Sequence, residues 1–125
     1  MIILDTSVFI DHLRGIERAV EALDRATVSG ERLAASVLTW TEILAGVRPR
    51  EMPETRRAFD AVDWIGVDVA IAERAGLLAN RYRAGYAGVD PVDYVIAATA
   101  DLFDAELWTR NLKHFPMFPD LRPPY

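Results

Sequence analysis

The amino-acid sequence predicts an α/β fold in which helices cover both faces of a mainly parallel sheet. Short apolar runs of strand length alternate along the chain with longer segments whose apolar residues follow helical spacing. Hydrophobic residues make up 51% of the chain and charged residues 26%, which is the composition of a globular protein. Because 125 residues cannot supply two separate cores of useful size, we expect one domain spanning residues 1–125.

In the first half of the chain, an apolar run at the N-terminus ends at Asp5, which is typical of a buried strand leading into a helix. The helix that follows is stopped by Gly15, and the next one carries its apolar residues on one face before Gly30. A second apolar strand then precedes a brief helix that Gly46 closes. These elements are predicted at residues 1–4, 8–13, 16–28, 32–36 and 39–45.

In the second half, a proline-containing loop is predicted at residues 48–53. A helical segment, an alternating strand and a long alanine-rich helix follow it, at residues 54–62, 64–68 and 70–86. Asp90 and Pro91 open a last helix, because Asp is favoured as an N-cap and Pro at the first helical position. Residues 106–109 form the fourth strand, and the proline-rich residues 116–125 are expected to be irregular.

Composition limits the function classes. The absence of cysteine excludes disulfides, a thiol nucleophile and a cysteine-based zinc site. The apolar run Ile2-Ile3-Leu4 before Asp5 is too short for a signal peptide or a membrane span, so we expect a cytoplasmic protein. The formal net charge of −5 argues mildly against a nucleic-acid partner. However, 13 of the 14 basic residues are Arg, whose planar guanidinium binds phosphate groups well. In addition, a metal ion bound by several carboxylates would make the net charge of the protein less negative.

Parallel sheets bind ligands at the carboxyl ends of their strands. This rule selects polar residues that follow or end the predicted strands as candidate site positions: Asp5, Thr6, Ser7, Ser36, Asp68, Thr109, Arg110 and Asn111.

Three carboxylates at helix starts are the main candidates, and each has an alternative role. Asp5 follows the first strand, and capping of the next helix is an equally good interpretation. Glu42 lies three residues after Thr39, which fits a capping box. Asp93 lies three residues after Asp90, which again fits a helix start without any catalysis.

Taken together, these three acids favour a metal site. Helix starts that follow parallel strands converge at one edge of the sheet, so we expect the three carboxylates to crowd together there. Carboxylates at close range repel one another unless a cation neutralises them. Oxygen ligands favour Mg²⁺ or Mn²⁺, whereas zinc favours His or Cys. His12 and His114 lie far apart in the sequence, and surface positions are the better interpretation for both.

The chain resembles the PIN-domain family, and within it the VapC-like branch of toxin nucleases from bacterial toxin–antitoxin pairs. Four motifs in the family's order carry the resemblance and together span nearly the whole chain: residues 1–10 (MIILDTSVFI), 39–46 (TWTEILAG), 93–100 (DYVIAATA) and 109–115 (TRNLKHF). The resemblance implies a three-layer α/β/α sandwich, frequent homodimerisation, an RNA substrate, and an antitoxin that inserts a segment near the active groove.

The resemblance also implies that Asp5, Glu42 and Asp93 bind Mg²⁺ or Mn²⁺ and that Thr6 or Ser7 supports the site. Many relatives have a fourth acid where this chain has Asn111. An amide oxygen can bind a metal but brings no charge, so binding of a second ion is weakened. Asp90 is a candidate accessory ligand, although a helix cap is the favoured interpretation.

The predicted activity is hydrolysis of RNA phosphodiester bonds by a metal-activated water, without a covalent intermediate. Arg110 is equally well interpreted as a phosphate contact or as a surface charge, and Thr109 lies beside it at the end of the last strand. The arginines at 48, 50, 56 and 57 fit a solvated helix face better than an RNA track. The aromatic residues Trp40, Phe59, Trp64 and Trp108 are expected in the core or an interface.

Two other functions are alternatives to this one. An aspartyl phosphatase would need a second Asp two residues after the first, where this chain has Ser7. The second alternative is a PIN-like binding module that acts only through partner contacts and has an idle site.

Overall fold

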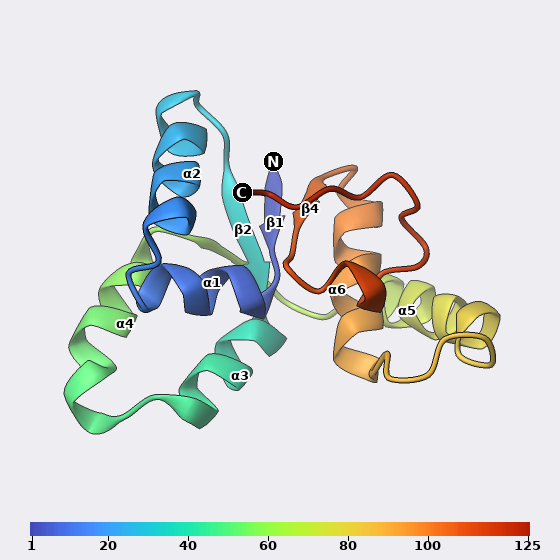
Figure 1. The fold of residues 1–125 in the computed structure, drawn as a ribbon. Helices are drawn as coiled ribbons and strands as arrows, with labels where there is room; N and C mark the ends of the chain where they lie inside the picture. Colours follow the sequence, from blue (N-terminus) through green and yellow to red (C-terminus); the bar gives the residue numbers. More distant parts are fainter.

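The computed structural model describes residues 1–125 and has one sheet of four parallel strands (Figure 1). The strands are β1 (Ile2–Leu4), β2 (Leu33–Ser36), β3 (Asp63–Ile65) and β4 (Glu106–Trp108), in the order β3-β2-β1-β4. In the register, Ile3 of β1 pairs with Ala34 on one side and Leu107 on the other. The predicted α/β fold with a parallel sheet is confirmed.

Six α-helices and two 3₁₀ turns surround the sheet. They are α1 (Thr6–Leu13), α2 (Glu17–Val28), α3 (Val37–Gly46), η1 (Pro49–Glu51), α4 (Met52–Asp60), α5 (Val69–Tyr82), α6 (Pro91–Leu102) and η2 (Leu112–His114). Figure 1 shows α1–α4 on one side of the strands and α5 and α6 on the other. None of these helices is long and apolar enough to cross a membrane.

Alternate residues of β1 belong to two different cores, one on each side of the sheet. Ile2 and Leu4 pack in a cluster with α1, α2 and α3, whereas Ile3 packs with Ile96 and Ala97 of α6. Side chains alternate between the two faces of a strand, so this apolar run serves both cores. The three layers of an α/β/α sandwich follow from this arrangement.

Four aromatic rings fill the core on the α1–α4 side. Phe59 has its ring 5.6 Å from that of Phe9, 4.5 Å from that of Trp40 and 4.9 Å from that of Trp64, measured between centroids. Trp108 is partly buried against the same cluster. The interpretation of these residues as core is confirmed.

Two predicted boundaries were wrong because a helix begins earlier than expected. Helix α3 begins at Val37, since the Ser36 hydroxyl accepts a hydrogen bond from the backbone N–H of Leu38 at 3.2 Å. The predicted loop at 48–53 contains η1 and the start of α4, where Pro49 and Pro53 occupy first-turn positions. A proline is tolerated there because those N–H groups have no partner within the helix.

Three other elements end earlier than predicted. Strand β3 ends at Ile65, and Asp68 caps α5 instead, since its Oδ1 accepts a hydrogen bond from the N–H of Ile71 at 2.9 Å. Helix α5 ends at Tyr82 rather than at residue 86, and Gly88 takes a positive φ of 89° in the following turn. Strand β4 ends at Trp108, one residue before Thr109.

Replacement of Phe59 by Ala should destabilise the protein strongly, because its ring is 3% exposed and touches three other aromatic rings. Loss of a buried Phe usually lowers the free energy of unfolding by about 3–5 kcal/mol. Urea denaturation followed by far-UV circular dichroism measures this change. The matched control is Phe103→Ala, because Phe103 is 46% exposed. A change in Phe59→Ala no larger than in that control would contradict the assigned core.

Candidate functional site

The candidate site lies where β1, β2 and β4 end, at one edge of the sheet. Asp5 directly follows β1, and its backbone N–H donates to the carbonyl of Trp108, the last residue of β4, at 2.9 Å. This bond continues the β1–β4 pairing by one residue and brings Asp5 next to Thr109. Two segments 104 residues apart in the chain therefore meet at this point.

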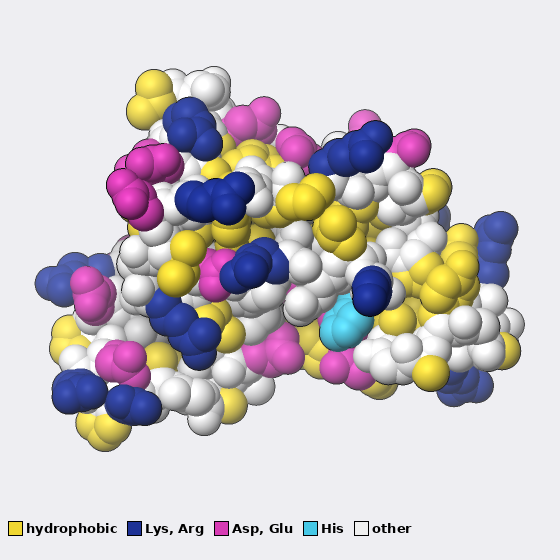
Figure 2. Space-filling view, viewed as in Figure 1, with side chains coloured by type: hydrophobic (Ala, Val, Ile, Leu, Met, Phe, Trp, Pro, Cys, Tyr) yellow, Lys and Arg dark blue, Asp and Glu magenta, His cyan; other side chains and the backbone are white.

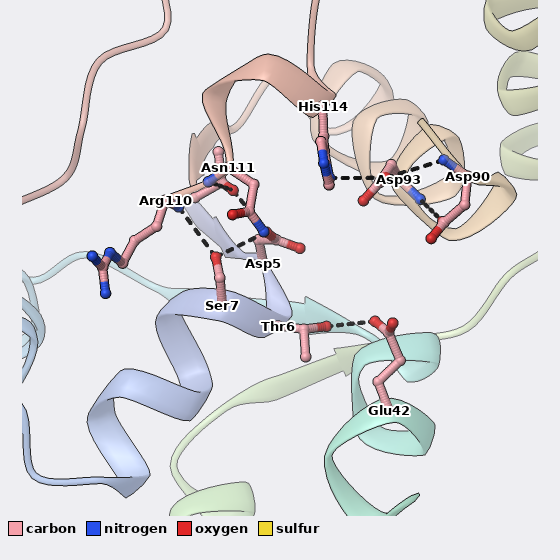
Figure 3. Close-up of polar contacts among 10 residues, drawn as sticks. Asp5, Thr6, Ser7, Glu42, Asp90, Asp93, Arg110, Asn111 and His114 are labelled. Atoms are coloured by element: carbon pink, nitrogen blue, oxygen red, sulfur yellow. Dashed lines mark hydrogen bonds and ion pairs between the residues drawn. The ribbon is translucent and has the colours of Figure 1, made fainter. Parts of the chain in front are cut away.

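The Asp5 carboxylate is 4% exposed and is held by two hydroxyl groups (Figure 3). Its Oδ2 accepts hydrogen bonds from Thr109 Oγ1 at 2.7 Å and from Ser7 Oγ at 3.0 Å. Asp5 occupies the N-cap position of α1, but its side chain makes no capping bond. The interpretation of Asp5 as a side-chain cap was therefore wrong. Its carboxylate instead accepts hydrogen bonds from Ser7 and Thr109 at the end of the sheet.

Backbone groups orient the two hydroxyls toward Asp5. The N–H of Arg110 donates to Ser7 Oγ at 3.1 Å, and the N–H of Asn111 donates to Thr109 Oγ1 at 3.0 Å. A hydroxyl that accepts a backbone N–H still has its own proton to donate, and here both protons go to Asp5. Ser7 and Thr109 therefore act together to position this carboxylate.

Glu42 reaches the same edge from α3. Because this helix begins at Val37, Glu42 lies in its second turn, and the capping-box interpretation was wrong. Its Oε1 accepts a hydrogen bond from Thr6 Oγ1 at 2.6 Å, and the hydroxyl oxygen of Thr39 lies 3.1 Å from that of Thr6. Thr6 has one proton, so both contacts are satisfied when Thr39 donates to Thr6 and Thr6 donates to Glu42.

Asp93 serves as a helix cap and also belongs to the site. Its Oδ2 accepts a hydrogen bond from the N–H of Asp90 at 3.2 Å, while Oδ1 of Asp90 accepts one from the N–H of Asp93 at 3.1 Å. The predicted cap is therefore confirmed. The same Oδ2 lies 3.3 Å from Nδ1 of His114 in η2, so this residue, expected at the surface, is also a neighbour of the site.

Burial is the main cause that raises the pKa of Asp93 to about 6, and nearby carboxylates of Asp90 and Asp5 raise it further. The backbone bond from Asp90 and the proximity of His114 act in the opposite direction. The influence of Asp5 on this pKa indicates that the two carboxylates share one electrostatic environment.

The three carboxylates surround a common space without forming a tight cluster. Figure 3 shows Asp5, Glu42 and Asp93 facing this space from β1, α3 and α6. No group of three acidic or histidine side chains comes together closely enough to form a ready-made metal site. The expected crowding is absent because each carboxylate is held by hydrogen bonds to its own neighbours.

The donor chemistry at this edge fits a hard divalent cation. Asp5 Oδ1, Asp93 Oδ1 and Glu42 Oε2 have no hydrogen-bond partner in the protein, and none of these oxygens is enclosed in the core. Carboxylate oxygens of this kind are the ligands that Mg²⁺ and Mn²⁺ prefer.

The remaining predicted residues lie at the margin of the site. Asp90 is exposed and uses one carboxylate oxygen as a cap, on the side of Asp93 away from Asp5 (Figure 3). Asn111 is exposed in the turn after β4. Arg110 is an ion-pair partner of Asp11, with Nη1 2.8 Å from Oδ2, so it is neither a free surface charge nor directed at Asp5. Ser36 and Asp68 act as helix caps.

In metal-free protein, Asp93 should make stability depend on pH. Its pKa is about 6 in the folded chain against an ordinary value of 3.8, so between these values the folded chain binds more protons than the unfolded chain. The free energy of unfolding should therefore fall as the pH rises through this window, and level off above it. Asp93→Asn should remove this contribution, as urea denaturation with chelator present can measure. The control variant is Asp120→Asn, which removes an exposed carboxylate and should keep the pH dependence of the wild type. If the difference in the free energy of unfolding between wild type and Asp93→Asn does not vary with pH, the raised pKa of Asp93 is contradicted.

Comparisons with known proteins agree with this architecture. The family model described as the PIN domain matches residues 2–116. The chain is 50% identical to "Ribonuclease VapC19" of Mycobacterium tuberculosis, with all of both chains covered. It is 41% identical to "Ribonuclease VapC10" of the same organism, covering all of this chain and 93% of that one.

Among solved structures, a toxin–antitoxin complex from Klebsiella pneumoniae matches with a TM-score of 0.82 and 31% identity, covering 100% of this chain and 98% of the other. The DNA-bound VapBC structure from Salmonella typhimurium has a TM-score of 0.81 at 20% identity, covers 98% and 95% of the two chains, and supports the fold alone. The chain therefore belongs to the PIN-domain family, in its VapC-like branch.

Proposed function

We propose that this protein is an endoribonuclease that hydrolyses RNA phosphodiester bonds with Mg²⁺ or Mn²⁺, and that it is the toxin of a toxin–antitoxin pair. The observation that carries the proposal is the set of Asp5, Glu42 and Asp93, which face one space from three elements, each with an unpaired carboxylate oxygen. Relatives named as ribonucleases, at 50% and 41% identity over the full chain, support the same activity.

In this proposal Asp5, Glu42 and Asp93 hold the cation, and Asp90 and Asn111 are candidates for further coordination. A bound divalent cation lowers the pKa of a water ligand and offsets negative charge on the phosphate. The protein's own hydroxyls have a positioning role. Ser7 and Thr109 hold Asp5, and Thr6 holds Glu42.

The hydrogen bonds of these hydroxyls support direct attack by water. Ser7, Thr109 and Thr6 each donate their proton to a carboxylate that the proposal assigns to the metal. None of them has a separate general base within hydrogen-bond distance, as an activated nucleophile would need. A covalent intermediate therefore has no support from this geometry.

The surface around the site suits both proposed partners. Figure 2 shows Lys and Arg side chains interspersed with Asp and Glu side chains over this face, so basic groups are available to an RNA backbone despite the net negative charge. A groove beside Glu42 is lined by apolar side chains from α1 and α3, including Ile10, Leu13 and Ile43, together with charged side chains of both signs. Such a groove suits an amphipathic segment of an antitoxin. Exposed apolar side chains on α5, namely Val69 and Leu77, are available for a homodimer.

The second candidate is a binding module with an idle site. Asn111 in place of an acid and the absence of a preassembled set of three ligands favour it. The two functions differ in a single measurement. A nuclease cleaves RNA with Mg²⁺ or Mn²⁺ and stops when EDTA is added, whereas a binding module cleaves under neither condition.

Asp5→Asn and Asp93→Asn should each lower RNA cleavage by more than about a hundredfold, because loss of even an outer partner of a metal ligand costs 10–100-fold. The assay is cleavage of labelled RNA with Mg²⁺ or Mn²⁺, and thermal melting verifies that each variant is folded. Asp120→Asn, an exposed acid elsewhere, should cleave like the wild type. Unchanged cleavage in both site variants would overturn the site assignment.

Expression of the wild type alone should arrest bacterial growth, and Asp5→Asn should not, because arrest requires the cleavage activity. Co-expression of the antitoxin from the neighbouring gene should restore growth. Growth curves after induction measure both effects, with protein levels matched by immunoblotting. Arrest by Asp5→Asn to the same extent as by wild type would argue that toxicity does not depend on the proposed nuclease.

A further inference from the structure

A second polar network, which the metal site does not include, lies next to it on α1. Asp11 is 6% exposed, and its Oδ2 accepts hydrogen bonds from Arg110 Nη1 at 2.8 Å and Tyr125 Oη at 2.7 Å. A buried carboxylate is costly unless charged or hydrogen-bonding partners compensate it. These two donors come from residues 99 and 114 positions away in the chain, so the carboxylate joins three separate segments.

Arg110 links this network to the site through its backbone. Its N–H donates to Ser7 Oγ, and Ser7 donates to Oδ2 of Asp5. Ser7 and Asp11 are four residues apart in α1, so they lie on one face of the helix about one turn apart. Arg110 therefore lies along that face, with its main chain on Ser7 and its guanidinium on Asp11.

The same geometry argues against a phosphate contact by Arg110. Figure 3 shows its side chain extending away from Asp5 and Glu42. Movement of the guanidinium toward the site would leave the buried Asp11 carboxylate with the Tyr125 hydroxyl as its remaining donor. An unpaired buried charge is strongly destabilising, so the ion pair opposes that movement. The pKa of Arg110 is raised, mainly by its hydrogen bond to Asp11, which agrees with a persistent pair.

We propose that Asp11 is a positioning residue for the site. The Asp11 carboxylate accepts hydrogen bonds from Arg110 and Tyr125. Its bond to the Arg110 side chain keeps the turn formed by Thr109, Arg110 and Asn111 packed against α1. This turn supplies the N–H groups that orient the Ser7 and Thr109 hydroxyls toward Asp5. The effect on catalysis rests on the proposed nuclease function, whereas the effect on the turn does not.

The first test is amide hydrogen exchange, measured by NMR on the metal-free protein. In Asp11→Asn, the Arg110 amide should exchange at least about tenfold faster, because a hydrogen bond to a charged group contributes about 1.5 kcal/mol or more and 1.36 kcal/mol corresponds to a factor of ten. The amide of Ile3 in the central strand should change much less. Tyr125→Phe removes one hydroxyl and no charge, so it should give a smaller change in the same direction, and it decides the question if Asp11→Asn does not fold.

The matched control is Asp63→Asn, which removes the carboxylate of the ion pair between Arg32 and Asp63, away from the site. It should leave the exchange of the Arg110 amide unchanged. A merely structural role for Asp11 predicts that the Arg110 and Ile3 amides accelerate by the same factor, and that result would overturn the proposal. An Arg110 amide no faster in Asp11→Asn than in Asp63→Asn would overturn it as well.

The second test is steady-state RNA cleavage. Asp11→Asn and Arg110→Met should lower kcat by about tenfold with KM within about twofold. This is the low end of the 10–100-fold cost of losing an outer partner of a metal ligand, because both residues act on Asp5 through Ser7 and Thr109. Arg110→Lys keeps the charge and should recover part of this loss. A rise in KM with unchanged kcat would instead mean that Arg110 binds substrate, which contradicts the proposal. If the wild type cleaves no RNA, the proposed function fails, and the exchange experiment still decides the role of Asp11.

Discussion

The burial of the Asp5 carboxylate is the constraint on which the other features of the site depend. An ionised group at 4% exposure needs strong hydrogen-bond donors, and this carboxylate receives two hydroxyls, from Ser7 on α1 and Thr109 after β4. Thr109 can reach it because β4 is the neighbour of β1 in the sheet, although the two strands lie at opposite ends of the chain. The hydrogen bond from Thr109 to Asp5 therefore requires the strand order β3-β2-β1-β4, in which β1 and β4 are neighbours.

The three candidate carboxylates show why capping and metal binding are hard to separate in a sequence. Both roles use Asp or Glu near the start of a helix. Glu42 fits a capping box only if α3 begins after Thr39, but Ser36 caps it three residues earlier. Asp93 caps α6 with one carboxylate oxygen and leaves the other free. The side chains of Asp5 and Glu42 make no cap, whereas Asp93 caps α6. The helix start separates the two roles for Glu42, but Asp5 occupies the N-cap position of α1, and only its hydrogen bonds to Ser7 and Thr109 show that its side chain does not cap.

The order of strands and helices could be predicted because it depends on local periodicity. The residues at the ends of β1 and β4 followed from the parallel sheet. Asp11, Thr39 and Tyr125 could not be predicted in the same way, because their roles depend on partners 33 to 114 positions away. The one local signal for Asp11 was a charged residue among the apolar positions of α1. Pro49 and Pro53 favoured a loop in the sequence but lie in the first turns of η1 and α4, because proline both interrupts helices and begins them.

Helix α1 connects most of these contacts. Thr6 reaches Glu42, Ser7 reaches Asp5, and Asp11 holds the turn that orients Ser7 and Thr109. A small displacement of α1 would therefore move two carboxylates of the site relative to Asp93, which α6 carries. The groove beside Glu42 is formed in part by Ile10 and Leu13 of this same helix. The residues that line the groove and the residues that support Asp5 and Glu42 therefore lie on the same helix, and a segment bound in the groove would contact the element that holds both carboxylates.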